Sequence, residues 1–283
     1  MIVFKKTSDL RKHLDYQRQI GNRIGFVPTM GALHEGHISL IEASKKVNQL
    51  TVSSVFVNPA QFNDLKDFEK YPVTIEKDIE KLINAGCDVL FLPSVTEMYP
   101  EGLSSPQHYA LGYLEEILEG KFRPGHFQGV CLIVHKLLDK VLPDNLYLGQ
   151  KDYQQCMVIT RLIELIGYNN TIRANICPTL READGLAMSS RNIRLNKEER
   201  DTATSIFRVL NFIKENIKVG DLAGIKINGI TQLLKAGFKV DYIEIADANT
   251  LTLLKTWDGE QKLVAVAAVF LNEVRLIDNM LLN

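Results

Sequence analysis

Two histidines inside a glycine-containing segment are the first candidates for chemistry. Residues 28–37 read Pro-Thr-Met-Gly-Ala-Leu-His-Glu-Gly-His and directly follow the apolar run Ile24–Val27. His34 and His37 are three residues apart, so the first turn of a helix would place both rings on one side. Imidazole N–H groups can donate to phosphate oxygens that gain charge in a transition state. The spacing therefore predicts that this segment stabilises charge on a phosphate.

The surrounding glycines support this interpretation but leave alternatives open. Gly31 and Gly36 allow a tight turn, and a helix N-terminus favours phosphate. The segment is not a standard phosphate loop, because it lacks Gly-x-Gly-x-x-Gly, and Gly36 is followed by His-Ile in place of Lys-Ser/Thr. The histidines could instead be a surface or helix-capping pair, or half of a metal site.

A second candidate, Asn58-Pro59-Ala60-Gln61-Phe62, follows the next apolar run. The Gln61 amide has both a donor and an acceptor for a hydroxylated substrate. The alternative is a proline turn that carries a surface glutamine.

Two further segments carry positive charge. Lys151 stands where the chain passes from a predicted strand through Gly149 into a helix, a position where an ammonium group can meet phosphate. Asp152 could equally be a helix N-cap, and Gln155 would share its helix face. Residues 188–191, Met-Ser-Ser-Arg, supply hydroxyls and a guanidinium, and alone they would suit a solvated loop and helix cap.

Five segments, in chain order, resemble the motifs of one enzyme family. The first resembles the His-x-Gly-His signature of the class I nucleotidyltransferase superfamily, in the form found in pantothenate synthetases. The five segments are residues 29–37, 58–62, 121–127, 149–155 and 181–192. The resemblance implies ATP-dependent condensation of (R)-pantoate with β-alanine through an enzyme-bound pantoyl adenylate. The products would be pantothenate, AMP and diphosphate, on the route to coenzyme A.

The resemblance also implies roles for individual residues. His37 is the expected proton donor. The residues expected to stabilise charge on the phosphates are His34, His37, Lys151, Ser189, Ser190 and Arg191. The expected ATP-binding residues are Met30, Gly31, Ala32, Leu33, His34, Glu35, Gly36, His37, Gly149, Gln150, Lys151, Asp152, Leu180, Met188, Ser189, Ser190 and Arg191. The expected contacts of pantoate and β-alanine are Met30, Asn58, Gln61, Phe62 and Gln155.

Magnesium is expected to bridge the phosphates of ATP, which is a co-substrate, and to need few protein ligands. Asp78 could assist the ion through water, although Glu76, Asp78 and Glu80 form mostly a solvated helix face in the pattern of charges. No tightly bound organic cofactor is expected. The role of His126 is not readable from spacing.

Composition limits the class of partner. The chain has 283 residues, with 33 Lys and Arg against 34 Asp and Glu, so its formal net charge is −1. Such a chain has no basic field for a nucleic acid, and small molecules are the expected partners. The resemblance implies a homodimer formed through the N-terminal domain.

Apolar runs and cysteines bear on the compartment. The longest apolar run, Leu263–Leu271, is shorter than the roughly 20 residues that span a bilayer, and it is predicted to be a buried strand. The N-terminus lacks the apolar core of a signal peptide. The four cysteines are widely spaced and predicted to be buried thiols: Cys87, Cys131, Cys156 and Cys177. We therefore expect a cytoplasmic protein without membrane association.

The elements that must position these residues follow an α/β pattern. Predicted strands lie at Ile24–Val27, Thr51–Val57, Asp88–Leu92, Asn145–Leu148 and Thr171–Ile176. Predicted helices lie between them at 37–47, 73–85, 127–141 and 152–166. This alternation predicts a Rossmann-like parallel sheet, which binds ligands beyond the carboxyl ends of its strands.

After about residue 180 the pattern changes. A polar loop precedes predicted helices at 197–216 and 221–236 and strands at 239–246, 262–271 and 273–278, which suit an antiparallel sheet. We expect an ATP- and pantoate-binding domain at 1–179 and a smaller α+β domain at 180–283. The second domain and the loop 181–191 are predicted to close over the site as a lid that keeps water from the adenylate.

Two other functions compete with this prediction. The first segment alone would also suit an adenylyl- or cytidylyltransferase that releases its product and uses no amine, but residues 58–62 and 149–155 disfavour this. A non-catalytic nucleotide-binding protein of the same fold would be expected to lack the histidines or Lys151, and all three are present.

Overall fold

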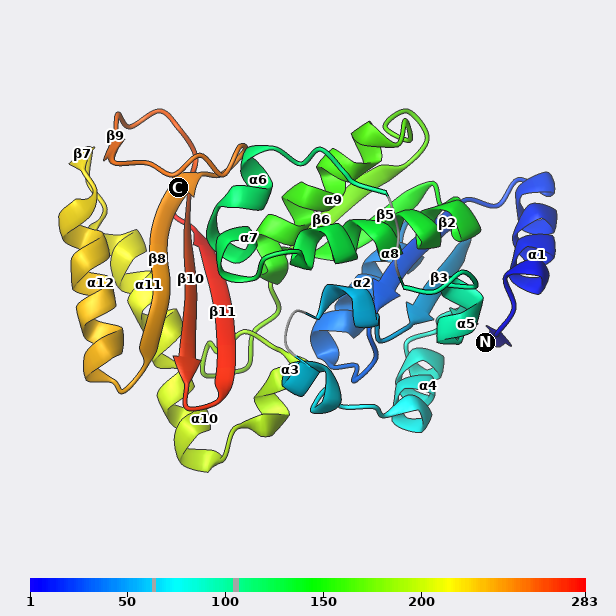
Figure 1. Ribbon diagram of the computed structural model, residues 1–283, viewed down its shortest axis with the longest axis horizontal. Coiled ribbons are helices and arrows are strands. Elements are labelled where there is room, and N and C mark those ends of the chain that lie inside the picture. The colour runs from blue at the N-terminus through cyan, green and yellow to red at the C-terminus, as the bar shows by residue number, and fades with distance from the viewer. Residues whose placement is uncertain (63–64, 104–106) are drawn as a thin grey trace. The chain divides into compact units, whose positions relative to one another are not determined.

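The computed structural model describes residues 1–62, 65–103 and 107–283, which form two compact units (Figure 1). The first unit contains Met1–Gly149 and Gln155–Pro178. The second contains Thr179–Asn283 together with Gln150–Gln154, a short segment from the middle of the chain. Each unit is described by itself below.

The first unit is built on a six-stranded sheet in which every neighbouring pair is parallel. In spatial order its strands are β1 (Ile2–Phe4), β4 (Val89–Phe91), β3 (Leu50–Val55), β2 (Ile24–Thr29), β5 (Asn145–Gly149) and β6 (Arg173–Cys177). The predicted Rossmann-like sheet is confirmed, and the five predicted strands end within two residues of the observed ends.

Helices cover both faces of this sheet because alternate strand residues point to opposite sides. Phe26 and its neighbour Val27 are both fully buried, but they belong to different apolar clusters. The cluster around Phe26 contains residues of α1 (Thr7–Gln19), α8 (His126–Val141) and α9 (Tyr153–Leu165). The cluster around Val27 contains residues of α2 (Glu35–Lys45) and α4 (Ile75–Asn84).

Short elements complete the first unit, and the sequence pattern did not predict them. They are the 3₁₀ helix η1 (Pro59–Gln61) and the helices α3 (Leu65–Glu69), α5 (Val95–Met98), α6 (Tyr113–Glu116) and α7 (Leu118–Phe122). The edge strand β1 and the helix α1 were also missed. β1 is only three residues long and partly exposed, and α1 buries only Leu10 and Leu14. Neither element therefore produces a strong apolar pattern.

The order of the strands creates a switch point between β2 and β5. The chain passes from β2 to β3 and β4 on one side, whereas β5 pairs with β2 on the other. In open parallel sheets, ligands bind outside the carboxyl ends of the strands at such a point. The histidine segment leaves β2, and Gly149 ends β5, so both candidate segments begin at this place.

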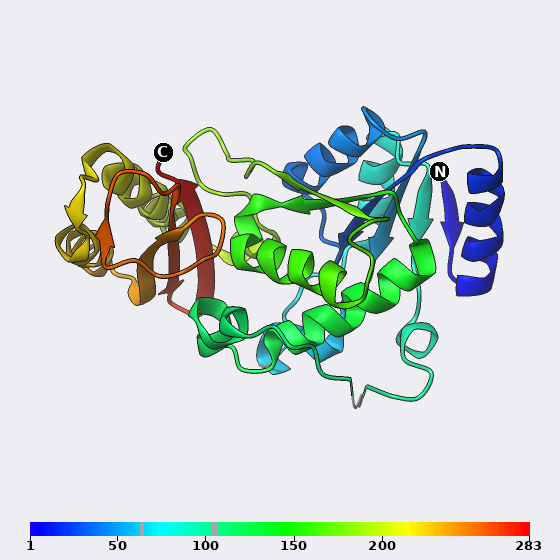
Figure 2. The ribbon, with the colours of Figure 1, turned by 90° about the horizontal axis from the view of Figure 1, so that it is seen from above.

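The second unit has a three-stranded antiparallel sheet, in the order β11 (Val274–Leu281), β10 (Leu263–Leu271) and β8 (Lys239–Asp247). The helices α11 (Ser205–Asn216) and α12 (Ala223–Lys235) pack on one face of it (Figure 2). The strands β7 (Gly220–Asp221) and β9 (Thr256–Trp257) form a small separate ladder. The remaining elements are η2 (Gln150–Asp152), η3 (Ser190–Arg194) and α10 (Lys197–Ala203). The predicted smaller α+β region is therefore confirmed.

The longest apolar run is β10, and every residue in it except Phe270 is buried. The prediction of a buried strand is confirmed. Across the described ranges, no helix is both long enough and apolar enough to cross a membrane.

The single helix predicted at 197–216 is wrong, because the structure has two helices with Thr204 between them. The Thr204 hydroxyl donates to the Asp201 carbonyl at 2.7 Å. A threonine that bonds back to the preceding turn competes with the helical ladder and bends the helix.

Candidate active site

His34 and His37 lie together at the start of α2. Their ring centroids are 4.0 Å apart, and His34 occupies the N-cap position. The backbone N–H of His34 donates to His37 Nδ1 at 3.3 Å. Because Nδ1 is the acceptor, a neutral His37 ring carries its proton on Nε2. The predicted pairing is confirmed, and the capping interpretation holds at the same time.

Asp78 of α4 holds the loop that precedes these histidines. Its carboxylate accepts the N–H of Ala32 at 3.0 Å and the N–H of Leu33 at 2.8 Å, and the Thr74 hydroxyl donates to it at 3.1 Å. Asp78 is only 1% exposed, so the expected solvated helix face is wrong at this position. Successive backbone N–H groups make a concave binding place for an anion, and here they contact an internal carboxylate.

The loop backbone is shaped to fit this carboxylate. Gly31 and Ala32 have φ angles of +81° and +49°, in the left-handed region. A Cβ at Gly31 would lie 3.0 Å from Asp78 Oδ2 and 3.1 Å from a Val55 methyl carbon. Both the positive φ and these close contacts therefore favour glycine at this position. Alanine in this conformation stores about 1–3 kcal/mol of strain, which the Asp78 bonds must offset.

The predicted substrate contacts after β3 also lie together. Asn58 donates to the Gln61 side-chain oxygen at 3.1 Å, and Gln61 donates to the Met30 sulfur at 3.1 Å. Gln61 is 9% exposed, so the alternative of a surface glutamine is wrong. Phe62 contacts the rings of Phe68 and Tyr71 edge-on. Three of the predicted substrate residues, Met30, Asn58 and Gln61, are thus joined by direct contacts.

Residues that the sequence could not assign support Asn58 and Gln61. The Tyr99 hydroxyl donates to Asn58 Oδ1 at 2.6 Å, and His126 Nδ1 lies 2.8 Å from the Gln61 carbonyl oxygen. A Cβ at Gly129 would lie 2.1 Å from the Ala60 carbonyl, so glycine lets α8 approach η1 closely. These partners are 41 to 71 residues distant in the chain, so no local spacing could reveal them.

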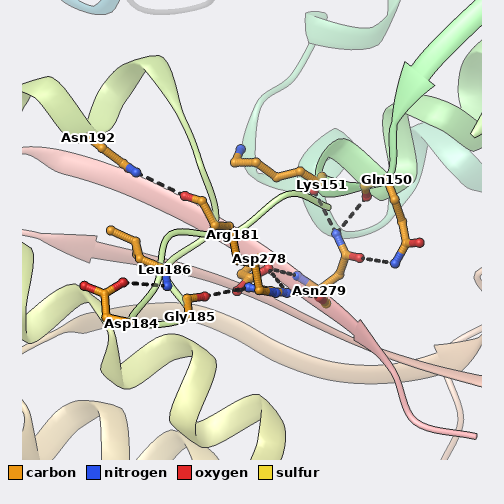
Figure 3. Close-up of polar contacts among 10 residues, drawn as sticks. Gln150, Lys151, Arg181, Asp184, Gly185, Leu186, Asn192, Asp278 and Asn279 are labelled. Carbon is orange, nitrogen blue, oxygen red and sulfur yellow. Dashed lines mark hydrogen bonds and ion pairs between the residues drawn. The ribbon is translucent and has the colours of Figure 1, made fainter. Parts of the chain in front are cut away.

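The second unit carries Lys151. Its ammonium lies 3.9 Å from an Asp152 oxygen, and the side chain is partly buried within η2. Asn279 of β11 donates to the backbone carbonyls of Gln150 at 2.9 Å and Lys151 at 2.8 Å (Figure 3). Gln155, by contrast, is half-buried on α9 in the first unit.

Residues 188–191, the serine-bearing segment, follow a tight turn of the second unit. Arg181 and Ala187 form an antiparallel bridge, and Gly185 between them has a φ of +91°. A Cβ at Gly185 would lie 2.1 Å from the Phe207 ring. The turn ends at Ser189, whose hydroxyl accepts the N–H of Arg191 at 3.2 Å and caps η3. The helix-cap interpretation of this serine is therefore confirmed.

The remaining predicted ATP contacts are distributed in the same way. On the first unit they occupy the loop between β2 and α2, the first turn of α2 and the end of β5. On the second unit they occupy η2, the two positions that flank the turn (Leu180 and Met188) and the start of η3. The Leu180 carbonyl accepts the backbone N–H of Met188 at 3.1 Å, and Leu180 is 40% exposed, whereas Ser190 is buried.

An ion pair anchors the turn. The Arg181 guanidinium donates to both oxygens of Asp278, at 2.7 and 3.0 Å, and to the Gly185 carbonyl at 3.1 Å (Figure 3). Burial raises the pKa of Asp278, and the charge of Arg181 opposes that rise. Sequence reasoning identified Arg181 only as part of a motif and missed Asp278.

The described side chains do not form a metal site by themselves. Within the described part of the chain, no group of three or more His, Cys, Asp and Glu side chains could hold a metal ion. Cys87, Cys131 and Cys156 are buried as predicted, Cys177 is half-buried, and all four are free thiols. Burial raises the pKa of Cys87 and of Cys131 to about 12, which makes both thiols poor nucleophiles.

Comparisons with known proteins place these features in context. Residues 2–281 match the family model described as pantoate-beta-alanine ligase. The chain is 44% identical over 282 residues to the pantothenate synthetase of Porphyromonas gingivalis, covering 99% of each chain. The crystal structure of pantothenate synthetase from Thermus thermophilus has a TM-score of 0.89, 39% identity and 99% coverage of both chains. Pantoate-beta-alanine ligase from Francisella tularensis, solved in complex with beta-gamma ATP and beta-alanine, has a TM-score of 0.83, 36% identity and coverage of 99% and 97%.

Proposed function

The chain belongs to the pantoate–β-alanine ligase family, and we propose that it condenses (R)-pantoate with β-alanine while cleaving ATP to AMP and diphosphate. The observation that carries this proposal is the family match over residues 2–281, within which the histidine pair and the Asn58–Gln61 contacts are assembled as described.

The chemical problem is that a carboxylate does not condense with an amine in water at neutral pH. In the first step, a pantoate carboxylate oxygen attacks the α-phosphorus of ATP, and diphosphate leaves. In the second step, the uncharged amine of β-alanine attacks the acyl carbon, and AMP leaves with the carboxylate oxygen. The amide bond of pantothenate replaces the mixed anhydride of pantoyl adenylate.

The first step requires donors for the charge that develops on the phosphates. His37 Nε2 can donate because Nδ1 already accepts the His34 N–H. We propose that His34, Lys151, Ser189, Ser190 and Arg191 add to this electrostatic stabilisation, which is a large term in phosphoryl-transfer catalysis. The remaining predicted ATP contacts are proposed to position the nucleotide.

The first unit supplies the proposed pantoate contacts. Gln61 and Gln155 would bind the hydroxyls and carboxylate of pantoate, with Asn58 supporting Gln61 and with Met30 and Phe62 as apolar walls. The Asn58–Gln61–Met30 contacts support this proposal because they fix the Gln61 amide before the substrate arrives.

Magnesium is proposed to accompany ATP as its phosphate-bound counterion. The ion keeps several waters and takes phosphate oxygens as ligands, so it needs few protein groups. The Asp78 carboxylate is engaged with two backbone N–H groups, and no step of the proposed reaction passes through a protein-bound metal.

The decisive experiment is exchange of labelled diphosphate into ATP. We expect exchange that depends on (R)-pantoate and needs no β-alanine, with net AMP formation only after β-alanine is added. Exchange that depends on another acid or on a phosphate ester, with release of a nucleotidylated product, would instead indicate a nucleotidyltransferase.

Three wider features belong to the same proposal. We propose that residues 1–179, apart from the Gln150–Gln154 segment that groups with the second unit, act as an ATP- and pantoate-binding domain and that residues 180–283 act as a lid. We also propose that the protein is a homodimer formed through its N-terminal domain. Light scattering of the purified protein measures the mass and tests the dimer. The four free thiols support a reducing compartment, the cytoplasm.

A further inference from the structure

Asn279 of β11 contacts the segment that carries Lys151 through three side-chain hydrogen bonds. Its side-chain NH₂ donates to the carbonyls of Gln150 and Lys151, and its side-chain oxygen accepts from Gln150 Nε2 at 3.2 Å. Asn279 is 2% exposed. The Gln150–Gln154 segment clusters with the C-terminal residues, and these bonds contribute to that association.

The backbone of Asn279 is fixed by the neighbouring ion pair. Its N–H donates to Asp278 Oδ1 at 2.7 Å, and its carbonyl accepts from Arg181 Nη2 at 3.0 Å. Arg181 also binds the Gly185 carbonyl in the turn that leads to Ser189. Asp278 and Asn279 of β11 are therefore bonded to the backbone of residues 150 and 151 and to Arg181, which begins the turn that leads to Ser189 (Figure 3).

The chemistry at this position requires an amide. A carboxylate of the same size would offer no donor and would place negative charge against two carbonyl oxygens. An apolar side chain would leave the Gln150 and Lys151 carbonyls without this buried donor. Asparagine provides two donors and one acceptor at the required reach.

We propose that Asn279, oriented by the Arg181–Asp278 ion pair, is a positioning residue that fixes the Lys151 segment to the sheet that also anchors the serine-bearing segment. This inference rests on the proposed role of Lys151. Asn279 acts through the backbone of residues 150 and 151 and does not itself contact the reacting atoms. Misplacing a phosphate-binding group by about 1 Å can cost roughly 10²-fold in rate.

The sheet offers a matched control for general destabilisation. Arg275 of β11 and Asp241 of β8 form another largely buried ion pair, with Nε and Oδ2 2.9 Å apart. Asp241→Asn perturbs a charged contact in the same sheet, but the pair belongs to none of the segments assigned to ATP. Thermal unfolding of each variant measures the loss of stability separately from the loss of function.

The test is a double-mutant cycle in the diphosphate exchange reaction, with kcat and KM for ATP measured separately. We expect Asn279→Ala to lower kcat/KM for ATP by about 10²-fold in the wild-type background. In a Lys151→Ala background the same change should cost less than about threefold, because the group it positions is absent. Asn279→Ser has one hydroxyl donor in place of the two amide donors. We therefore expect an intermediate loss of about tenfold in its kcat/KM for ATP.

Three results would overturn the inference. The first is an equal loss of kcat/KM on Asn279→Ala in the wild-type and Lys151→Ala backgrounds. The second is an unchanged kcat/KM in both Asn279→Ala and Asn279→Ser while Lys151→Ala is impaired. The third is a loss of kcat/KM in Asp241→Asn as large as that in Asn279→Ala. Full activity of Lys151→Ala is a different outcome, because it would overturn the proposed role of Lys151 itself.

Discussion

His37 is oriented by the backbone of its own loop. The His34 N–H donates to Nδ1, so a neutral His37 ring carries its proton on Nε2, and Asp78 fixes the loop from the neighbouring helix. The residue types and their spacing were sufficient to predict the histidine pair, because both lie within one helical turn. They were insufficient to predict that Asp78 binds the backbone of this loop, because its partners Ala32 and Leu33 lie 46 and 45 residues earlier in the chain.

Replacing His37 tests the proposed donor. We expect His37→Ala to lower turnover by roughly 10²-fold or more, the scale expected for loss of a transition-state hydrogen-bond donor. Steady-state turnover is compared after circular dichroism has shown that the variant is folded. Near-native turnover in a folded variant would exclude this role for His37.

Replacing Asp78 tests how the loop is held. Asp78→Ala leaves the N–H groups of Ala32 and Leu33 without their carboxylate, and we expect unfolding to become easier by about 1–3 kcal/mol for each group left unpaired. Urea titration measures this change, and Glu76→Ala on the exposed face of the same helix is the control. Asp78→Asn should lower turnover at any magnesium concentration. Recovery of its turnover at high magnesium would favour the water-mediated metal role instead.

Secondary-structure elements were predictable where apolar residues form a clear run or repeat at the spacing of a strand or a helix. The strands of the parallel sheet and the helices between them follow from apolar runs bounded by turn residues. β1 and α1 were missed because an edge strand of three residues and a helix with two buried leucines leave little pattern. The break at Thr204 was missed because it depends on one side-chain hydrogen bond rather than on composition.

The attachment of α1 gives a prediction about pH. Glu97 of α5 accepts the Thr7 N–H at the start of α1 at 2.9 Å and forms an ion pair with Lys6 at 3.2 Å. The Thr7 hydrogen bonds are the main cause that lowers the pKa of Glu97 from 4.5 to about 2. Glu97→Gln keeps an oxygen acceptor but removes its charge and the ion pair with Lys6, so it should cost about 1 kcal/mol at neutral pH, the difference between a charged and a neutral hydrogen bond.

The sign of the pH dependence follows from the lowered pKa. A carboxylate with a depressed folded-state pKa stabilises the protein above its unfolded-state value, and this contribution is lost as pH falls. The stability difference between wild type and Glu97→Gln should therefore shrink as pH falls from about 4.5 to about 2. Urea unfolding across this range measures the difference, and Glu101→Gln serves as the exposed control. A difference that grows on acidification would contradict the assignment.

At the scale of the whole molecule, the motifs that are consecutive in the sequence are divided between two compact units. The histidine segment and Asn58–Gln61 belong to the first unit, and Lys151 with the serine-bearing segment belongs to the second. The order of the motifs was enough to identify the family. The order of the motifs did not predict that Gln150–Gln154 group with the C-terminal residues, because this grouping involves Asn279, which lies 128 residues beyond Lys151.

The central claim is that an acyl adenylate connects ATP cleavage to amide formation. If the pantoate carboxylate attacks the α-phosphorus, one of its oxygens must leave with AMP. The most direct measurement is therefore a reaction with (R)-pantoate labelled with ¹⁸O in both carboxylate oxygens, followed by mass spectrometry of the nucleotide and phosphate products. We predict one ¹⁸O atom in each AMP and none in diphosphate. ¹⁸O in inorganic phosphate with ADP as the nucleotide product, or AMP without the label, would contradict the account.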